Sequence, residues 1–271
     1  MRGVTVSRGL VTAILFALVA VFILGPLVWL AAHAFATSWT YPNLLPDGLT
    51  LHWWSVVFGD AQLGAAVTNS LYFAPLTVAV SAVVCLPAAY AFSRFDFPGR
   101  RVFLIGLFAT NAFPKMGLFV AMASLFYGLH LMNTVIGIVI VQFIGTVVFM
   151  TWIPAAAFSS VPRSLEEAAQ DAGAGRLRTF LSVTLPMALP GILVAVLMSF
   201  LASFDEAQGT YLVGAPVYMT MPTEMYTLVL NYPKQVAAVF AILLSIPSVA
   251  LLLVARKYIM GGRLAEGFQI R

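Results

Sequence analysis

Charge is scarce in this chain of 271 residues, because Asp, Glu, Lys and Arg together make up only 9% of it. Soluble domains carry about 25% charged and roughly 45–50% apolar residues, whereas 61% of this sequence is hydrophobic. This composition excludes an ordinary water-soluble domain and predicts that lipid is the main solvent. The basic residues lie in short gaps between apolar runs rather than in one patch, so nucleic-acid binding does not explain the net charge of +4.

Residues that carry catalytic or metal chemistry are equally sparse. The single cysteine, Cys85, allows no intrachain disulfide, and the three histidines are scattered without metal-ligand spacing. A phosphate-binding loop needs Gly-x4-Gly-Lys-Ser/Thr, but Lys115, Lys234 and Lys257 are followed by Met, Gln and Tyr. The sequence therefore predicts no ATP-binding loop, no cofactor or metal site and no enzymatic activity in this chain.

Long apolar runs dominate what is present. A membrane-spanning helix needs about 20 mostly apolar residues, and six stretches qualify, at residues 10–36, 70–93, 102–127, 133–158, 187–212 and 236–260. We therefore predict an all-α membrane protein with six transmembrane helices in a single domain over residues 1–271. The first run is much longer than the roughly 7–15 apolar residues of a secretory signal, so we interpret it as a retained anchor.

The basic residues also predict the orientation in the membrane. Of the 14 basic residues, all except Lys115 and Lys234 lie in the terminal tails or in the gaps after the second and fourth stretches. Positive residues favour the cytoplasmic side, so both termini are predicted to be cytoplasmic, as an even number of spans requires. The loop at residues 37–69 is then external. Its aromatic residues suit either anchoring at the lipid headgroups or docking of an external partner.

One polar, alanine-rich segment interrupts the apolar pattern at residues 164–186, after the fourth stretch. Ser164 followed three residues later by Glu167 is a capping box, which predicts a helix that begins there. Gly173 is well placed to end this helix in a left-handed conformation. A second short helix is predicted over residues 175–185, ended by the proline that follows. We expect this helix, turn and helix to lie at the cytoplasmic membrane surface.

The first of these helices has a small, shallow face formed by Leu165, Ala168, Ala169 and Ala172, which fall at helical spacing. Such a face lets another backbone approach closely, so the helix suits a groove on a cytoplasmic partner. A helix that rests on lipid is the alternative, but such helices favour Lys or Arg together with bulky apolar residues. The acidic, alanine-rich composition disfavours that alternative.

The segment resembles the cytoplasmic coupling signature of permease subunits of bacterial ABC importers. That signature is Glu-Ala-Ala, three residues, Gly, nine residues, an aliphatic residue, one residue and Leu-Pro. Val183 stands where Ile is commoner, and the other matching positions are Glu167, Ala168, Ala169, Gly173, Leu185 and Pro186. The resemblance extends over most of the chain, including AAYAFSRFDFPGRR after the second stretch.

The resemblance implies the architecture of a type I ABC importer permease in the bacterial inner membrane. It implies that the coupling residues, Asp171 among them, dock into a cleft of a separate ATPase and transmit its closure to the spans. It further implies a second permease subunit, two ATPase subunits that bind ATP and Mg, and an external solute-binding protein. This chain itself would bind no cofactor.

Ionisable groups inside a membrane are costly and are therefore candidates for function. Two polar groups interrupt the predicted spans and could line a solute pathway: Asn111 and Lys115 beside Pro114 in the third stretch, and Asp205, Glu206 and Gln208 near the end of the fifth. One alternative is a kinked third helix whose lysine reaches the interface. The other is a fifth helix that ends before its acidic pair.

The solute class stays open between two branches of the family. The stretch FDEAQGTYLVGAPVYMTMPTEMYTLV looks like the polyamine and aminophosphonate branch, where carboxylates would pair with a cationic solute. FPGRR and VPRSLEEAAQDAGA look equally like the carbohydrate branch, whose hydroxyls could donate to the same carboxylates. A secondary transporter is the alternative class, but it would need inverted repeats and mid-membrane ion sites, and no convincing repeat is present.

Overall fold

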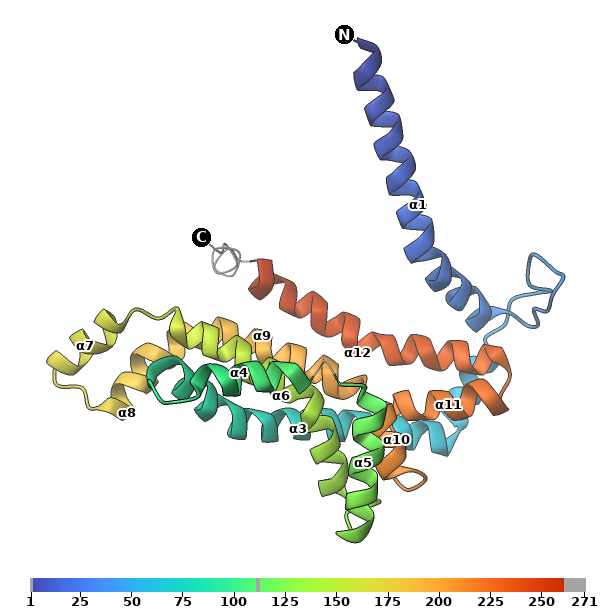
Figure 1. Cartoon of the computed structure of the whole chain (residues 1–271). Helices are drawn as coiled ribbons and strands as arrows, with labels where there is room; N and C mark the ends of the chain where they lie inside the picture. The colour runs from blue at the N-terminus through green and yellow to red at the C-terminus, as the bar shows by residue number, and fades with distance from the viewer. Residues whose placement is uncertain (1, 111–112, 261–271) are drawn as a thin grey trace. The chain divides into compact units, whose positions relative to one another are not determined.

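The computed structural model describes residues 2–110 and 113–260, which form helices joined by loops (Figure 1). Within these residues no strand is formed, and an isolated β-bridge pairs Ala36 with Leu49. The predicted all-α class is confirmed. The elements are α1 (Arg2–Phe35), α2 (His52–Gly59), α3 (Ala61–Arg94), α4 (Arg100–Ala109), α5 (Lys115–Gly128), α6 (Val135–Ser159), α7 (Arg163–Asp171), α8 (Arg176–Thr179), the π-helix η2 (Phe180–Thr184), α9 (Leu185–Phe204), α10 (Gln208–Gly214), α11 (Met221–Asn231) and α12 (Lys234–Met260).

In the described residues, five helices are long and apolar enough to cross a membrane. They correspond to the first, second, fourth, fifth and sixth predicted stretches, and they lie at Gly9–Phe35, Ala61–Arg94, Val135–Ser159, Arg176–Phe204 and Lys234–Val254. The second begins earlier than predicted, because the helix already starts at Ala61.

The third predicted stretch, residues 102–127, is two helices rather than one. α4 has 10 residues and ends at Ala109, and α5 has 14 residues and begins at Lys115 after Pro114. Proline has no backbone N–H and disfavours a helical conformation in the residue before it, which accounts for the break. Because a crossing needs about 20 residues, neither helix crosses a membrane alone.

The fifth predicted stretch, residues 187–212, also ends early. α9 ends at Phe204, Asp205 follows as its C-cap, and a separate short helix, α10, begins at Gln208. The structure therefore agrees with the alternative in which the fifth span ends before the acidic pair. Asp205 and Glu206 lie at the junction between α9 and α10.

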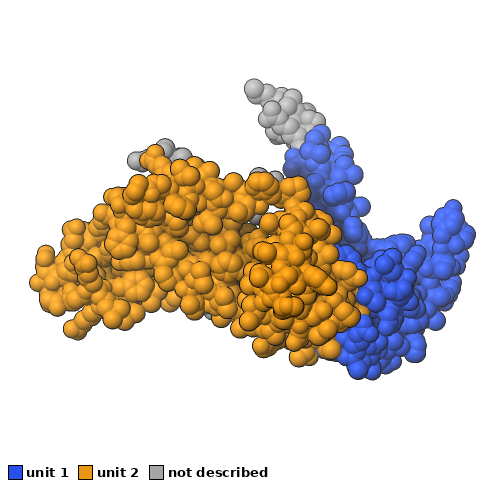
Figure 2. Space-filling model, turned by 60° about the horizontal axis from the view of Figure 1, so that its bottom comes forward, with its two compact units in different colours: residues 1–64, 225–246 blue, residues 65–224, 247–271 orange. Residues whose placement is uncertain are grey.

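The chain divides into two compact units, coloured separately in Figure 2. Unit 1 comprises Met1–Gly64 and Met225–Ile246, and unit 2 comprises Ala65–Glu224 and Pro247–Arg271. The coupling segment and the polar residues that follow α9 all belong to unit 2.

In unit 2, α6 packs extensively against α9. Gly191 of α9 lies so close to α6 that a Cβ atom at its position would fall 2.5 Å from the Cβ of Ala157. Phe158 and Ile192 belong to a buried apolar cluster at the same contact. Close approach through small residues is a common way for helices to associate in lipid, so this contact forms a rigid centre for the unit.

In unit 1, two tryptophans of the predicted external loop are bonded to the end of α1. The indole N–H of Trp53 donates to the carbonyl of Ala36 at 3.0 Å, and that of Trp54 donates to the carbonyl of Ala34 at 3.1 Å. The last carbonyls of a helix have no partner within the helix. These indoles therefore stabilise the C-terminus of α1, whereas headgroup anchoring or partner docking by the loop stays a prediction.

Candidate functional site

The coupling segment contains α7, whose start differs from the prediction. The helix begins one residue before Ser164, its N-cap is Pro162, and no side chain caps it. The capping box predicted from Ser164 and Glu167 is therefore wrong. Pro162 adopts an extended conformation with φ −61° and ψ 128°. This places Ser164 inside the first turn, where its backbone is helical rather than extended as a capping residue requires.

The predicted glycine turn at the end of α7 is confirmed. Gly173 has a φ of +89°. Its N–H donates to the carbonyl of Gln170 at 2.9 Å, and the N–H of Ala174 donates to the carbonyl of Ala169 at 3.0 Å. These two bonds form a Schellman motif, which closes the C-terminus of a helix. No atom lies within 4 Å of a Cβ built at Gly173, so the positive φ alone requires glycine.

The second helix of the segment does not end at Pro186. α8, η2 and α9 form one helical run at Arg176–Phe204, and Pro186 lies in the first turn of α9. The N–H of Leu185 donates to the carbonyl of Phe180, five residues back. The wider π turn carries the helix past the proline, whose missing N–H is tolerated in a first turn. The helix predicted over residues 175–185 is present from Arg176, but its predicted end at Pro186 is wrong, because the helix continues into the fifth span.

The predicted coupling residues differ in exposure. Ala169 is half-buried, whereas an exposed surface is formed by Leu165, Glu167, Ala168 and Asp171. We call these four residues the α7 surface. An exposed helix face is available for docking into a groove of a partner, and that docking stays a prediction.

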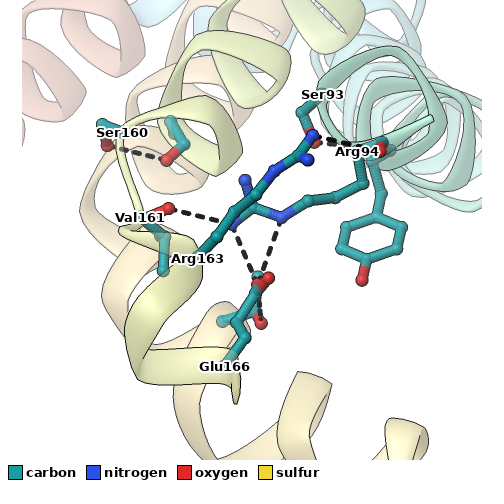
Figure 3. A network of polar contacts seen from close by, with 9 residues as sticks. Ser93, Arg94, Ser160, Val161, Arg163 and Glu166 are labelled. Atoms are coloured by element: carbon teal, nitrogen blue, oxygen red, sulfur yellow. Dashed lines mark hydrogen bonds and ion pairs between the residues drawn. The ribbon is translucent and has the colours of Figure 1, made fainter. Parts of the chain in front are cut away.

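Glu166, next to this surface, has different surroundings. Its side chain is 12% exposed and forms an ion pair of 2.9 Å with Arg94 at the end of α3 (Figure 3). The hydroxyl of Thr184 in η2 donates to the same carboxylate oxygen at 2.5 Å. This contact could not be predicted from the sequence, because Arg94 lies 72 positions away and no local pattern links the two residues.

A cavity of about 510 Å³ in unit 2 is lined by residues of α5, α6 and α9 and of the α9–α10 junction. Four of the predicted pathway residues line it: Lys115 at the start of α5, and Asp205, Glu206 and Gln208 after α9. The fifth, Asn111, lies outside the described residues. The break in the third stretch and the early end of the fifth thus bring these polar residues together.

Within this cavity lining, Glu206 and Asp205 have different surroundings. The carboxylate of Glu206 accepts hydrogen bonds from the N–H of Gly209 at 2.9 Å, the N–H of Thr210 at 2.8 Å and the Thr210 hydroxyl at 2.7 Å. It therefore caps α10. The side chains of Asp205 and Lys115 make no hydrogen bond or ion pair with any described residue, so their charges remain available to a solute.

A buried polar network extends from this cap into the helix core. Gln142 of α6 is 1% exposed. Its amide oxygen accepts from the hydroxyls of Thr77 at 3.1 Å and Ser203 at 2.8 Å, and its amide nitrogen donates to Thr210 at 3.2 Å. Because Thr210 also bonds to Glu206, the network joins the cap of α10 to α3, α6 and α9.

The sequence contains a pattern that indicates this network, but the pattern consists of neutral polar residues rather than ionisable ones. Thr77 and Ser81 are four residues apart, as are Gln142 and Thr146, and this spacing places each pair on one helix face. The hydroxyls of Ser81 and Thr146 lie 2.6 Å apart. Two polar faces in apolar helices therefore meet inside the unit.

Comparison with known proteins gives a family and several relatives, among them two sugar-transport permeases. Residues 82–260 match the family described as binding-protein-dependent transport system inner membrane component. The maltodextrin transport system permease protein MdxG of Bacillus subtilis is 28% identical over 240 residues, which cover 86% of this chain and 82% of the relative. The trehalose/maltose transport system permease protein MalG of Thermococcus litoralis is 27% identical over 268 residues, which cover 93% of each protein.

Several solved structures share the fold, and two of them are alginate transporters. One is the crystal structure of a bacterial ABC transporter involved in the import of the acidic polysaccharide alginate, with a TM-score of 0.72, 22% identity and coverage of 93% of this chain and 96% of that one. The other is a bacterial alginate ABC transporter in complex with an alginate pentasaccharide-bound periplasmic protein. Its TM-score is 0.67 at 17% identity, and the match covers 98% of this chain and 96% of that one.

Proposed function

Since the chain belongs to the family of binding-protein-dependent transport system inner membrane components, we propose that it forms the translocation pathway for a carbohydrate in an ATP-driven importer. It is a multi-pass inner-membrane protein and a transport subunit rather than an enzyme. The carbohydrate class, the coupling residues and the partner subunits are the proposed parts of this function.

The α7 surface carries the proposal that the chain couples to a separate ATPase. The surface is exposed, the turn at Gly173 closes its helix, and the chain then runs into Arg176–Phe204 without a break. A partner that pushes on α7 would therefore act on a spanning helix. The ATPase must be a separate subunit, because the three lysines of this chain are not part of a P-loop.

The proposed complex contains four further subunits around this chain. A second permease would complete the pathway, and two ATPase subunits would bind ATP and Mg. An external solute-binding protein would deliver the sugar. The solved alginate transporter with a pentasaccharide-bound periplasmic protein supports this last assignment by likeness of fold.

The cavity supports a carbohydrate as solute. Its volume of about 510 Å³ lies within the roughly 300–1,000 Å³ of small-molecule sites. Asp205 can accept hydrogen bonds from hydroxyls, and Lys115 can donate to them. The lining holds the carboxylates of Asp205 and Glu206 beside the single cation Lys115, so its charge alone does not separate a sugar from a polyamine. The maltodextrin and trehalose/maltose relatives favour a carbohydrate.

Purification of the tagged chain, expressed with its native neighbours, tests this proposal. An ATPase and a second permease should co-purify, and ATP hydrolysis in proteoliposomes should rise with the binding protein plus maltose or trehalose. Spermidine serves as the control solute and should have no effect. Stimulation by spermidine alone would overturn the carbohydrate class, and solute uptake without any ATPase would overturn the importer.

A further inference from the structure

Glu166 and Glu167 are identical neighbours with opposite surroundings. Glu167 is exposed on the α7 surface and makes no side-chain hydrogen bond or ion pair with any described residue. Glu166 turns inward, with a side chain that is 12% exposed. The coupling motif includes Glu167 and omits Glu166, so the proposed function gives Glu166 no role.

Arg94, the last residue of α3, is the main partner of Glu166. Its side chain is 8% exposed, and both its Nη2 and its Nε donate to Glu166 Oε1, at 2.9 Å and 3.2 Å (Figure 3). Nη2 also donates to the carbonyl of Val161 at 3.0 Å, and Arg163 donates to the carbonyl of Arg94 at 3.3 Å. Side chain and backbone of this one arginine therefore hold the turn between α6 and α7 against α3.

Thr184 adds a third element to this contact. It is 1% exposed, it lies in the π-helix, and its hydroxyl donates to the Glu166 oxygen that Arg94 also contacts. We call Arg94, Glu166 and Thr184 the latch. Through one carboxylate, α7 is bonded both to the end of α3 and to the helical run that continues as α9.

A neighbouring ion pair provides a contrast. Arg100 and Asp96 are 3.1 Å apart, but their side chains are 33% and 89% exposed. Exposed pairs contribute little to stability, because water and salt screen them. Removal of one partner from a desolvated pair leaves a buried charge without compensation. Breaking the latch is therefore expected to cost more free energy than breaking the Arg100–Asp96 pair.

We propose that the latch positions α7 rigidly on α3 and on the α9 run, so that movement of α7 displaces both spans together. This inference rests on the proposed function, because the ATPase supplies the movement. Without the latch, α7 keeps the bond from Arg163 to the backbone of Arg94 at its first residue and the turns at Pro162 and Gly173, about which it can pivot. The α7 surface would then still dock, but α7 would rotate about these two turns and would not displace α3 and the α9 run.

The test compares ATP hydrolysis with sugar import in proteoliposomes that hold the complete complex. Import is followed with radiolabelled maltose, or with trehalose or maltotriose where the unmodified complex prefers it. Glu166→Gln and Arg94→Met break the latch from either side, and Thr184→Val removes one bond without leaving a buried charge. The matched controls are Asp96→Asn and Arg100→Met, which break the exposed pair in the same two ways.

In Glu166→Gln and Arg94→Met, the sugar imported per ATP hydrolysed should fall about tenfold, which corresponds to about 1.4 kcal/mol, while ATP hydrolysis persists. Thr184→Val should lower the same ratio less, and Thr184→Ser, which keeps the hydroxyl, should restore it. Both controls should keep the unmodified ratio. An unchanged ratio in the two latch variants overturns the inference, and so does an equal fall in Arg100→Met.

Hydrogen exchange gives a second readout that needs no transported sugar. The amides of residues 163–171 should exchange faster in Glu166→Gln than in the unmodified chain, and Glu167→Gln should leave them unchanged. Equal protection in both variants overturns the latch. Absence of an ATPase from the purified complex would instead be a failure of the proposed function, and exchange measured on the chain in lipid nanodiscs would still decide the latch.

Discussion

The acidic pairs Glu166–Glu167 and Asp205–Glu206 lie near opposite ends of the helical run Arg176–Phe204, and their members divide in the same way. One member of each pair is bonded inside the protein: Glu166 in the latch and Glu206 as the cap of α10. The other member has no side-chain partner among the described residues and belongs to the α7 surface or the cavity lining. Successive residues of α7 point about 100° apart, and Asp205 and Glu206 lie where the chain has left α9. In both places, neighbours of identical charge can therefore divide between holding the structure and facing a partner.

The largest effect is expected in an experiment that locates the first pair on one side of the membrane, because a cysteine there is either labelled from outside or not. Arg178→Cys, in the same segment, should be protected from an impermeant maleimide in sealed right-side-out vesicles. Asp47→Cys, in the predicted external loop, should react. The native Cys85 is 2% exposed and contributes little background. Labelling of Arg178→Cys in sealed vesicles would contradict the cytoplasmic position of the α7 surface.

The next largest effect is expected from Gly173→Val, which disturbs the α7 surface without touching either glutamate. A β-branched residue at φ +89° is strained by about 1–3 kcal/mol. Docking should weaken by about tenfold or more, measured as lost stimulation of ATP hydrolysis by the sugar-loaded binding protein. Gly175→Val is the matched control, because Gly175 has φ −66° and no atom within 4 Å of its Cβ position. Equal losses in both variants would rule out backbone strain as the cause.

The second pair can be separated by its effect on stability. Glu206→Ala removes the acceptor of three hydrogen bonds at the start of α10, and loss of such a cap costs about 1–2 kcal/mol. Asp205→Ala removes no bond within the described residues, so its effect should stay within about 0.5 kcal/mol. Thermal unfolding in lipid nanodiscs measures both. Equal destabilisation by the two substitutions would contradict the assignment of Glu206 to the cap of α10 and of Asp205 to contact with a solute.

The smallest expected effect concerns sugar import through the cavity. Asp205→Asn keeps the size of the side chain and removes its charge, which weakens a hydrogen bond from a hydroxyl by about 1 kcal/mol. Import should fall about fivefold with unchanged stability and complex assembly. Lys115→Gln should act in the same direction, because it removes the opposite charge of the same cavity. Unchanged uptake by Asp205→Asn over the whole range of sugar concentration would remove this residue from the pathway.

Elements with local causes could be predicted from the sequence. The apolar stretches located the spanning helices, and the spacing of Gly173 located the turn that its positive φ confirms. Local polarity also singled out Lys115 and Asp205, although it did not predict that they line one cavity. That meeting depends on where α5 begins and α9 ends, and both boundaries differ from the continuous stretches that hydropathy indicates.

The features that could not be predicted depend on competition between neighbouring local signals or on contacts between residues far apart in the sequence. The capping box at Ser164 failed because the extended conformation of Pro162 begins the helix earlier. The helix end predicted at Pro186 is wrong, because a π turn precedes this proline and the helix continues through it. Arg94 and Glu166 are 72 positions apart, and the sequence around neither residue indicates that the two form a pair.

The buried amide of Gln142 has a consequence for the synthesis of the chain. The ribosome synthesises α6 before α9 and α10, so Gln142 is made 61 residues before Ser203 and 68 residues before Thr210. During that interval only Thr77, among these three partners, has been made. An interhelical hydrogen bond of this kind contributes about 1–2 kcal/mol in lipid. In a nascent chain that stops before α10, the amide donor of Gln142 therefore lacks the Thr210 partner that it has in the finished protein.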